Sequence, residues 1–306
     1  MATDQQRRES AGETNQPAVA LTDGGQTMGA NADSRSSMVA IARLDHRDAR
    51  QSRLVRYLLY FFVLVCLIGG YAFPAVTSGD VTGDRFAGFM STSIGLLLPL
   101  VGLLLGYNAV VGDRESGRLK LLLSMPHSRR DVLAGKLLTR GGYLVAAVLI
   151  GLLGAGALVY YPFGSLSVSY LAYMAVTLGF GIIFFGIGVA LSTFLKSRQF
   201  ATVGAFGVFF LFVVIWEELL SVVVFLLEQV GGSGEPTDSL RFIHGAEPGL
   251  LYDRIIGAFF EGCSEGPYLG ADAPWYLGEW VALLLFALWV VTPLAIGYLR
   301  FTRTDL

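Results

Sequence analysis

The apolar stretch that decides the fold runs from Val168 to Leu191 and reads VSYLAYMAVTLGFGIIFFGIGVAL. It contains no Asp, Glu, Lys or Arg. A helix rises about 1.5 Å per residue, so a stretch of this length crosses the roughly 30 Å hydrocarbon core of a bilayer. Backbone groups find no hydrogen-bond partner in lipid, which makes the α-helix the simplest spanning structure. The stretch therefore predicts a transmembrane helix.

Five further stretches share this character, and together they predict an all-α integral membrane protein with six transmembrane helices. Hydrophobic residues make up 54% of the chain and charged residues only 15%, whereas soluble domains carry about 25% charge. The six predicted spans cover residues 55–73, 90–111, 141–161, 168–191, 201–227 and 276–299.

The segments before the first span predict two different structures. Residues 1–37 are rich in Gln, Thr, Ser, Gly and Asp and hold almost no large apolar residues, so we expect a disordered cytoplasmic tail. Residues 38–54 place arginines at spacings of three or four between apolar residues. That pattern predicts a basic helix at the cytoplasmic headgroups, with a solvated helix face as the alternative. The six-helix domain then occupies residues 55–306.

The distribution of Arg and Lys predicts which side of the membrane each loop occupies. Sixteen basic residues lie just before the first span, in the loop 112–140, in the turn 192–200 or at the C-terminus. The loops of the opposite side hold three, all arginines. Cytoplasmic loops carry the excess of Lys and Arg, so both termini are predicted to be cytoplasmic. The acidic segment 228–275 is then external, and its apolar pieces predict a short helix resting on the outer membrane surface.

Small residues recur at helical spacing inside several predicted spans. Gly102 and Gly106 are four residues apart, and Ala147, Gly151 and Ala155 share one helix face. Small faces let membrane helices approach closely. We expect them to serve packing within the chain rather than a dimer motif. The fourth predicted span carries Gly179, Gly181, Gly186 and Gly188.

The loop between the second and third predicted spans is the most informative segment for function. From Asp113 to Lys136 it reads DRESGRLKLLLSMPHSRRDVLAGK. Gly117 permits a break, the leucines that follow form an apolar patch between charges, and Pro126 ends that element. We expect a short helix parallel to the membrane. Its leucines either meet a protein partner or dip into the headgroup layer, since four leucines facing water are costly.

The next helix is predicted to start at the end of this loop. Ser128 and Asp131 have the spacing of a capping box, in which a serine side chain satisfies a free backbone amide at a helix start. Gly135-Lys136 is followed by Leu137, and position 130 is Arg rather than Gly, so the segment is not a phosphate-binding loop. The chain is therefore expected to bind no ATP of its own.

The pattern Glu-x-Gly-x-Leu-x-Leu-Leu-Leu-Ser-x-Pro-x-Ser-Arg, followed by Gly-Lys, resembles the coupling-helix region of ABC-2-type permeases. Within that family the resemblance is to the subgroup that includes the permease of the nitrous-oxide-reductase copper-maturation system. The six predicted spans, the cytoplasmic termini and the position of the loop agree with it. The matching residues are Glu115, Gly117, Leu119, Leu121, Leu122, Leu123, Ser124, Pro126, Ser128, Arg129, Gly135 and Lys136.

This resemblance implies a permease subunit of the plasma membrane, which is not an enzyme. A separate ABC ATPase would bind ATP and Mg²⁺, grip the coupling helix in a groove, and tilt the membrane helices as the ATPase pair closes. A second permease copy, identical or not, is expected, and the family favours export. No nucleic acid or metal is expected. The implied docking residues are Glu115, Gly117, Leu119, Leu122, Leu123, Ser124, Pro126, Ser128, Arg129 and Lys136, with Ser197 and Arg198 as a second contact.

Glu217 and Glu218 support an alternative hypothesis, because paired carboxylates within a span are costly and are candidates for function. A Glu-Glu pair is typical of membrane-embedded CAAX-type metalloproteases. Their pattern requires an Arg where this chain has Val222, and a His-x-x-x-Asn where His244 is followed by Pro248. The pair can instead lie near the outer interface and gate the mouth of a transport pathway.

A secondary transporter is the third class considered. It predicts ionisable residues near the bilayer midplane and internal repeats. Neither is evident in the six apolar stretches.

Overall fold

The computed structural model describes residues 53–77, 81–117, 129–160, 168–229, 237–260 and 274–303. Within these residues every regular element is helical, and six helices are long and apolar enough to cross a membrane. The prediction of an all-α membrane protein with six spans is confirmed. The candidate spans are Val55–Val76, Asp84–Glu115, Arg130–Val159, Val168–Phe194, Arg198–Ile215 and Glu279–Arg303.

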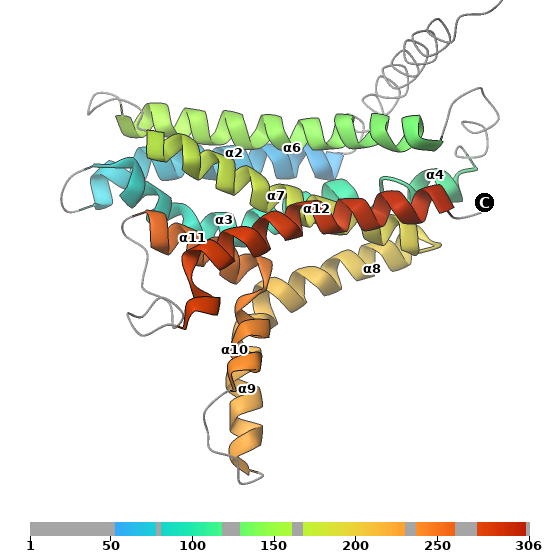
Figure 1. Ribbon diagram of the computed structural model, residues 1–306. Helices are drawn as coiled ribbons and strands as arrows, with labels where there is room; N and C mark the ends of the chain where they lie inside the picture. The colour runs from blue at the N-terminus through green and yellow to red at the C-terminus, as the bar shows by residue number, and fades with distance from the viewer. Residues whose placement is uncertain are drawn as a thin grey trace, which may run out of the picture.

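Five long helices run side by side along a common axis and form the bundle in Figure 1. They are α2 (Arg53–Val76), α3 (Gly83–Gly106), α6 (Arg129–Tyr160), α7 (Val168–Phe194) and α12 (Glu279–Arg303).

Seven shorter elements complete the described part of the chain. Figure 1 places α4 and the C-terminal end of α12 at the same end of the bundle. The short elements are α4 (Val111–Glu115), α8 (Arg198–Phe209), a π-helix (Phe210–Ile215), α9 (Trp216–Gln229), α10 (Asp238–Gly245), α11 (Pro248–Phe259) and a 3₁₀-helix (Trp275–Leu277).

Backbone contact between α3 and α7 lies at the centre of the bundle. A Cβ added to Gly106 would lie 2.5 Å from the carbonyl oxygen of Phe185, and one added to Gly102 would lie 2.8 Å from that of Gly181. A Cβ on Gly188 would lie 2.8 Å from the carbonyl oxygen of Leu103. The glycine pattern therefore packs two helices of the same chain, as predicted.

The same principle joins α2 to α6. A Cβ added to Gly70 would lie 2.7 Å from the Cα of Ala155, and one on Gly151 would lie 3.2 Å from the Sγ of Cys66. Small residues thus allow close approach in both helix pairs.

The predicted span 201–227 is not one continuous helix, and this prediction is wrong. The spanning part ends at Ile215, after a π-helical stretch over Phe210–Ile215. α9 then turns away from the bundle and lies beside α10, and we call these two helices the arm (Figure 1). A π-helix inserts a residue into the helical ladder, which changes the direction in which the following turns point.

The apolar residues after Leu250 form a helix, but not on the outer membrane surface as predicted. α11 packs against α3, α7 and α12, and it buries Leu251, Tyr252, Ile255 and Ile256 in the protein core. The ring of Tyr252 stacks on Phe180 of α7, with centroids 4.5 Å apart. Aromatic contacts within the bundle replace the expected contact with lipid.

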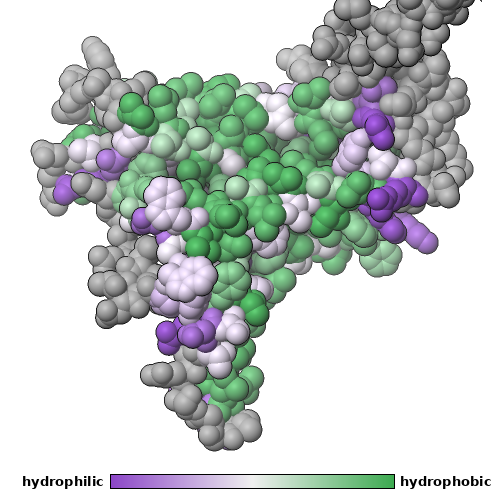
Figure 2. Space-filling view, in the orientation of Figure 1, coloured by the Kyte–Doolittle hydropathy of each residue, from purple (hydrophilic) through white to green (hydrophobic). Residues whose placement is uncertain are grey.

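Burial differs sharply among the spans. In the most apolar stretch of α3, 72% of residues are buried within the protein, whereas the figure for the span that contains α8 is 11%. Hydrophobic side chains cover the middle of the bundle surface, and hydrophilic ones gather toward its ends (Figure 2). α8 is therefore a peripheral helix, which buries Ala201 and Ala205 and exposes Phe200, Val203 and Phe206.

Candidate functional site

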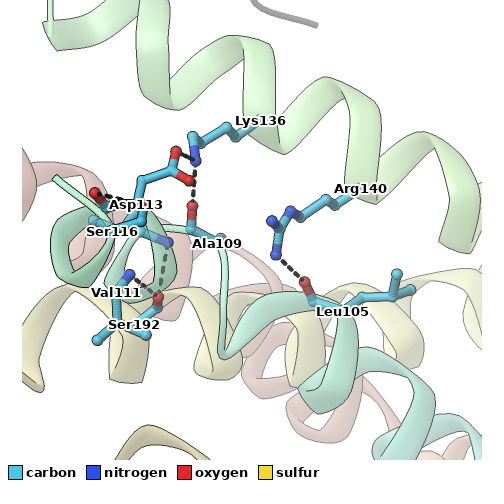
Figure 3. A network of polar contacts seen from close by, with 9 residues as sticks. Leu105, Ala109, Val111, Asp113, Ser116, Lys136, Arg140 and Ser192 are labelled. Atoms are coloured by element: carbon cyan, nitrogen blue, oxygen red, sulfur yellow. Dashed lines mark hydrogen bonds and ion pairs between the residues drawn. The ribbon is translucent and has the colours of Figure 1, made fainter. Parts of the chain in front are cut away.

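A polar network surrounds α4, at the end of the bundle where the predicted coupling segment begins (Figure 3). After α3 ends, the chain makes a short turn and re-enters a helix at Val111. The Oγ of Ser192, on α7, accepts hydrogen bonds from the amides of Val110 and Val111 at 2.8 and 3.0 Å. The first amides of a helix lack partners within it. Ser192 supplies that partner from a neighbouring helix and fixes the start of α4.

Lys136 joins α4 to α6. Its Nζ forms an ion pair with the Oδ2 of Asp113 and donates a hydrogen bond to the carbonyl oxygen of Ala109 at 2.7 Å. The Lys136 side chain is 4% exposed and that of Asp113 16%. A buried ammonium group is tolerated only when it is paired and hydrogen-bonded, and both conditions are met.

One turn further along α6, Arg140 makes a second contact of the same kind. Its Nη1 donates to the carbonyl oxygen of Leu105 at 3.3 Å, close to the C-terminus of α3. The last carbonyls of a helix are free acceptors at the negative end of its dipole, so cations are favoured there. Lys136 and Arg140, four residues apart on one face of α6, thus hold the end of α3 and the turn beyond it.

Glu115 connects α4 to α8. Its Oε1 accepts a hydrogen bond from the backbone amide of Arg198 at 2.7 Å, at the first position of α8. The Oγ of Ser197 accepts from the amide of Phe200 at 3.3 Å. Two free amides at the start of α8 are therefore satisfied, one by its own cap and one by α4. Arg114 adds a bond from its Nη1 to the carbonyl oxygen of Leu195 at 3.4 Å.

Gly117 closes this network on the side of the predicted coupling segment. Its φ of 70° lies in the left-handed region, where glycine carries no steric cost, and it is the only described residue in that region. The predicted break at Gly117 is confirmed. The helical conformation of α4 therefore ends before Gly117, and residues 118–128 follow in the sequence.

The structure brings together four of the predicted docking residues, Glu115, Lys136, Ser197 and Arg198, around one short helix. Gly117 follows that helix, and Arg129 begins α6 immediately after the predicted cap at position 128. Six predicted docking residues lie outside the described part of the chain. They are Leu119, Leu122, Leu123, Ser124, Pro126 and Ser128.

Three important residues of the network were not selected from the sequence: Asp113, Arg140 and Ser192. Asp113 stands in the quoted loop, and its charge opposite to that of Lys136 was a usable signal. Ser192 follows an apolar run, and a buried hydroxyl there needs a hydrogen-bond partner. The sequence does not show which residue supplies that partner.

Glu217 and Glu218 lie in α9, beyond the end of the fifth candidate span at Ile215. The Glu218 side chain is exposed. Within the described residues, no group of three or more His, Cys, Asp or Glu side chains is placed to hold a metal ion.

The fold and the network define a multi-pass helical membrane protein with a network of polar contacts around α4 at one end of its bundle. The sequence profile described as ABC-2 family transporter protein matches residues 39–306. The chain belongs to this family.

Two curated relatives cover nearly the whole chain. The probable ABC transporter permease protein NosY of Stutzerimonas stutzeri is 31% identical over 277 residues, which covers 86% of this chain and 97% of that protein. The protein of the same name from Pseudomonas aeruginosa is 30% identical over 274 residues, with the same coverage. This chain resembles both along their length.

Family membership decides between the classes considered from the sequence. The chain is an ABC-2 transporter permease component, and a permease is the non-enzymatic part of an ABC transporter, whose ATPase activity belongs to a partner. The hypotheses of a CAAX-type protease and of a secondary transporter receive no support from these relatives.

Proposed function

We propose that this chain is the membrane half of an ATP-driven exporter whose separate ATPase subunit grips residues 113–129 and the turn at Ser197 and Arg198. The hydrogen bond between Glu115 and the amide of Arg198 supports the proposal, because it joins the end of α4 to the start of α8, where the two contacts are proposed. ATP and Mg²⁺ belong to the partner, and this chain supplies a surface rather than a nucleotide site.

The end of the bundle that carries α4 is proposed to face the cytoplasm. The arginines near this end support that orientation, because cytoplasmic segments carry an excess of basic residues. They are Arg114 in α4, Arg130 at the start of α6, and Arg300 and Arg303 at the end of α12. Both termini are then cytoplasmic, and the plasma membrane is the proposed location.

A second permease copy, identical or different, is proposed to complete the transporter. The low burial of the span that contains α8 supports this, since only 11% of its apolar stretch is buried within one copy. The arm, which turns away from the bundle, carries Glu217 and Glu218, and we propose that they line the outer mouth of the pathway. Unchanged transport after the joint change of Glu217→Gln and Glu218→Gln would exclude that role.

The docking proposal is tested by co-purification from membranes. The chain is co-expressed with an ABC ATPase of the same organism, chosen first from the neighbouring gene. Leu122→Asp places a charge in the leucine patch and is expected to abolish co-purification while membrane insertion stays intact. Ser239→Asp is the control, because it adds the same charge to the exposed first turn of α10, where an acid is tolerated. Retained ATPase with Leu122→Asp would contradict the docking role.

A further inference from the structure

We propose that Arg254 is the positioning residue of the arm, because it fastens the end of α10 to the segment that opens α12 and so fixes the arm to α11 and α12. The inference rests on the proposed function in one respect, since it names what places Glu217 and Glu218 at the outer mouth. Three features carry it: the carbonyl groups at the end of α10, the fork of Arg254, and the π-helix before the arm.

The end of α10 binds three other helices through three successive carbonyl groups, those of residues 244–246. The donors are, in that order, the Nε1 of Trp216 in α9 at 3.0 Å, the Nη1 of Arg254 in α11 at 2.8 Å and the Nε1 of Trp289 in α12 at 2.8 Å. The last carbonyl groups of a helix have no partner within it. Side chains of three helices supply those partners, so the end of α10 is a common anchor for the arm.

Arg254 also binds the chain segment that opens α12. Its Nη2 donates to the carbonyl oxygens of Leu277 and Gly278, the latter at 3.4 Å, and α12 begins at the next residue. Arg254 is 4% exposed, and a buried guanidinium must be hydrogen-bonded. Its planar fork holds its acceptors at fixed angles, and its charge is favoured at the C-terminus of a helix. The side chain therefore fixes two chain segments relative to each other.

The helical path from α8 does not hold the arm by itself. The π-helix over Phe210–Ile215 stands between α8 and α9, and none of its residues is buried. α11, by contrast, buries Leu251, Tyr252 and Ile255 beside Arg254. Segments with few buried side chains open most readily. We therefore expect the arm to swing at the π-helix once its anchor on α11 and α12 is lost.

The place of the acidic pair follows from this anchor. Glu217 and Glu218 come directly after Trp216, whose indole is bonded to the end of α10. Their backbone is therefore placed by α11 and α12, and not by α8, from which the chain arrives. During transport we expect the pair to move with α12.

Two variants loosen the anchor in different ways. Arg254→Met keeps an unbranched side chain but removes every donor of the fork. Trp289→Phe keeps an aromatic ring and removes only the donor to the carbonyl of Ala246. Trp280→Phe is the matched control, because it makes the same change on a residue of α12 that is 71% exposed.

The experiment measures distances between spin labels in the full chain in nanodiscs, without the ATPase. Both cysteines are replaced, and labels are placed at Leu226 of α9 and Leu284 of α12, which are 55% and 67% exposed. A second pair, Leu138 of α6 with Leu284, reports on the bundle alone. Labelled chain is diluted with unlabelled chain so that one protomer reports.

We expect a narrow distribution of the distance between Leu226 and Leu284 in the unaltered chain and in Trp280→Phe. Arg254→Met and Trp289→Phe are expected to broaden it at least about twofold, because the arm then opens locally, with the bundle pair unchanged. If Arg254→Met yields no folded protein, Trp289→Phe decides by the same criterion.

A broad distribution in the unaltered chain, no broadening in Arg254→Met, equal broadening in Trp280→Phe, or equal broadening of the bundle pair would overturn the inference. Because no ATPase is present, such a failure leaves the docking proposal standing. The pathway role of Glu217 and Glu218 is tested separately, by their joint change to Gln.

Discussion

Trp216 and His244 hold each other through two reciprocal contacts. The Nε1 of Trp216 donates to the carbonyl oxygen of His244 at 3.0 Å, and the Nε2 of His244 lies 2.9 Å from the carbonyl oxygen of Trp216. Because a carbonyl only accepts, Nε2 carries the proton. The two rings also stack, with centroids 6.2 Å apart. The pair fastens the start of α9 to the end of α10 where the chain leaves the π-helix.

Trp216→Phe is expected to lower stability by about 1 kcal/mol, because the carbonyl of the buried His244 loses the shorter of its two hydrogen bonds and keeps the one from the amide of Glu247 at 3.4 Å. The apparent melting temperature of the detergent-purified protein should fall by a few degrees. Trp280→Phe is the control, since Trp280 is 71% exposed on α12 and should tolerate the change. Equal melting temperatures for the two variants would show that the reciprocal contacts do not hold the arm.

Gly106→Ala is expected to prevent normal packing of α3 on α7. Its Cβ would lie 2.5 Å from the carbonyl oxygen of Phe185 and 2.7 Å from the amide nitrogen of Val189, and neither backbone atom can rotate away. Gly95→Ala on the same helix meets nothing within 4 Å and should be neutral or stabilising by about 0.5–1 kcal/mol. The two variants are compared by their yield of monodisperse protein after size-exclusion chromatography, which we expect to fall only for Gly106→Ala. Equal yields would contradict the backbone contact.

Lys136→Met is expected to destabilise the protein by about 3 kcal/mol, because Asp113 and the carbonyl of Ala109 both lose their partner. Asp113→Asn should cost less, since the amide oxygen still accepts from the ammonium group. Lys196→Met, on an exposed residue of the turn before α8, serves as the control. Thermal unfolding ranks the three variants by melting temperature. If Lys196→Met had the lowest melting temperature, the stabilising role of the ion pair would be refuted.

Ser192→Ala is expected to cost about 2–3 kcal/mol, because two buried amides, those of Val110 and Val111, lose their acceptor together. Thr193→Val should cost less than about 1 kcal/mol, since the hydroxyl of Thr193 only donates to the carbonyl of Ala190 within its own helix. Limited proteolysis near residues 118–128 reports on α4, and faster cleavage is expected only in Ser192→Ala. Identical cleavage of both variants would count against the contact.

The six spans could be predicted because a bilayer permits few backbone structures and demands a fixed length of apolar sequence. The fifth span could not be bounded in this way. Glu217 and Glu218 interrupt the apolar residues of 201–227 directly after Trp216, which was a usable sign that the span ends there, but composition carries no sign of the π-helix at Phe210–Ile215. The apolar residues of α11 were similarly ambiguous, because a helix on lipid and a helix in a protein core need the same side chains.

The residue types of the candidate site were visible in the sequence, but their contacts were not. Glu115 and Arg198 were each selected as docking residues, yet nothing in the sequence predicts that residues 83 positions apart meet through a backbone amide. Ser192 was missed for the same reason, since its partners are amides, which every residue except proline carries. Tertiary placement, rather than residue type, decides these contacts.

The glycine faces of α3 and α7 have a consequence for the transport cycle. α3 and α7 contact each other through their backbones, with no layer of side chains between them that could rearrange. We therefore expect the two helices to move as one rigid unit. We expect the helices that move during transport to lie around this pair, and the span that contains α8 is the least buried of the six candidate spans. An alanine in place of Gly102, Gly106 or Gly188 would therefore be expected to disturb the rigid pair against which the other helices move.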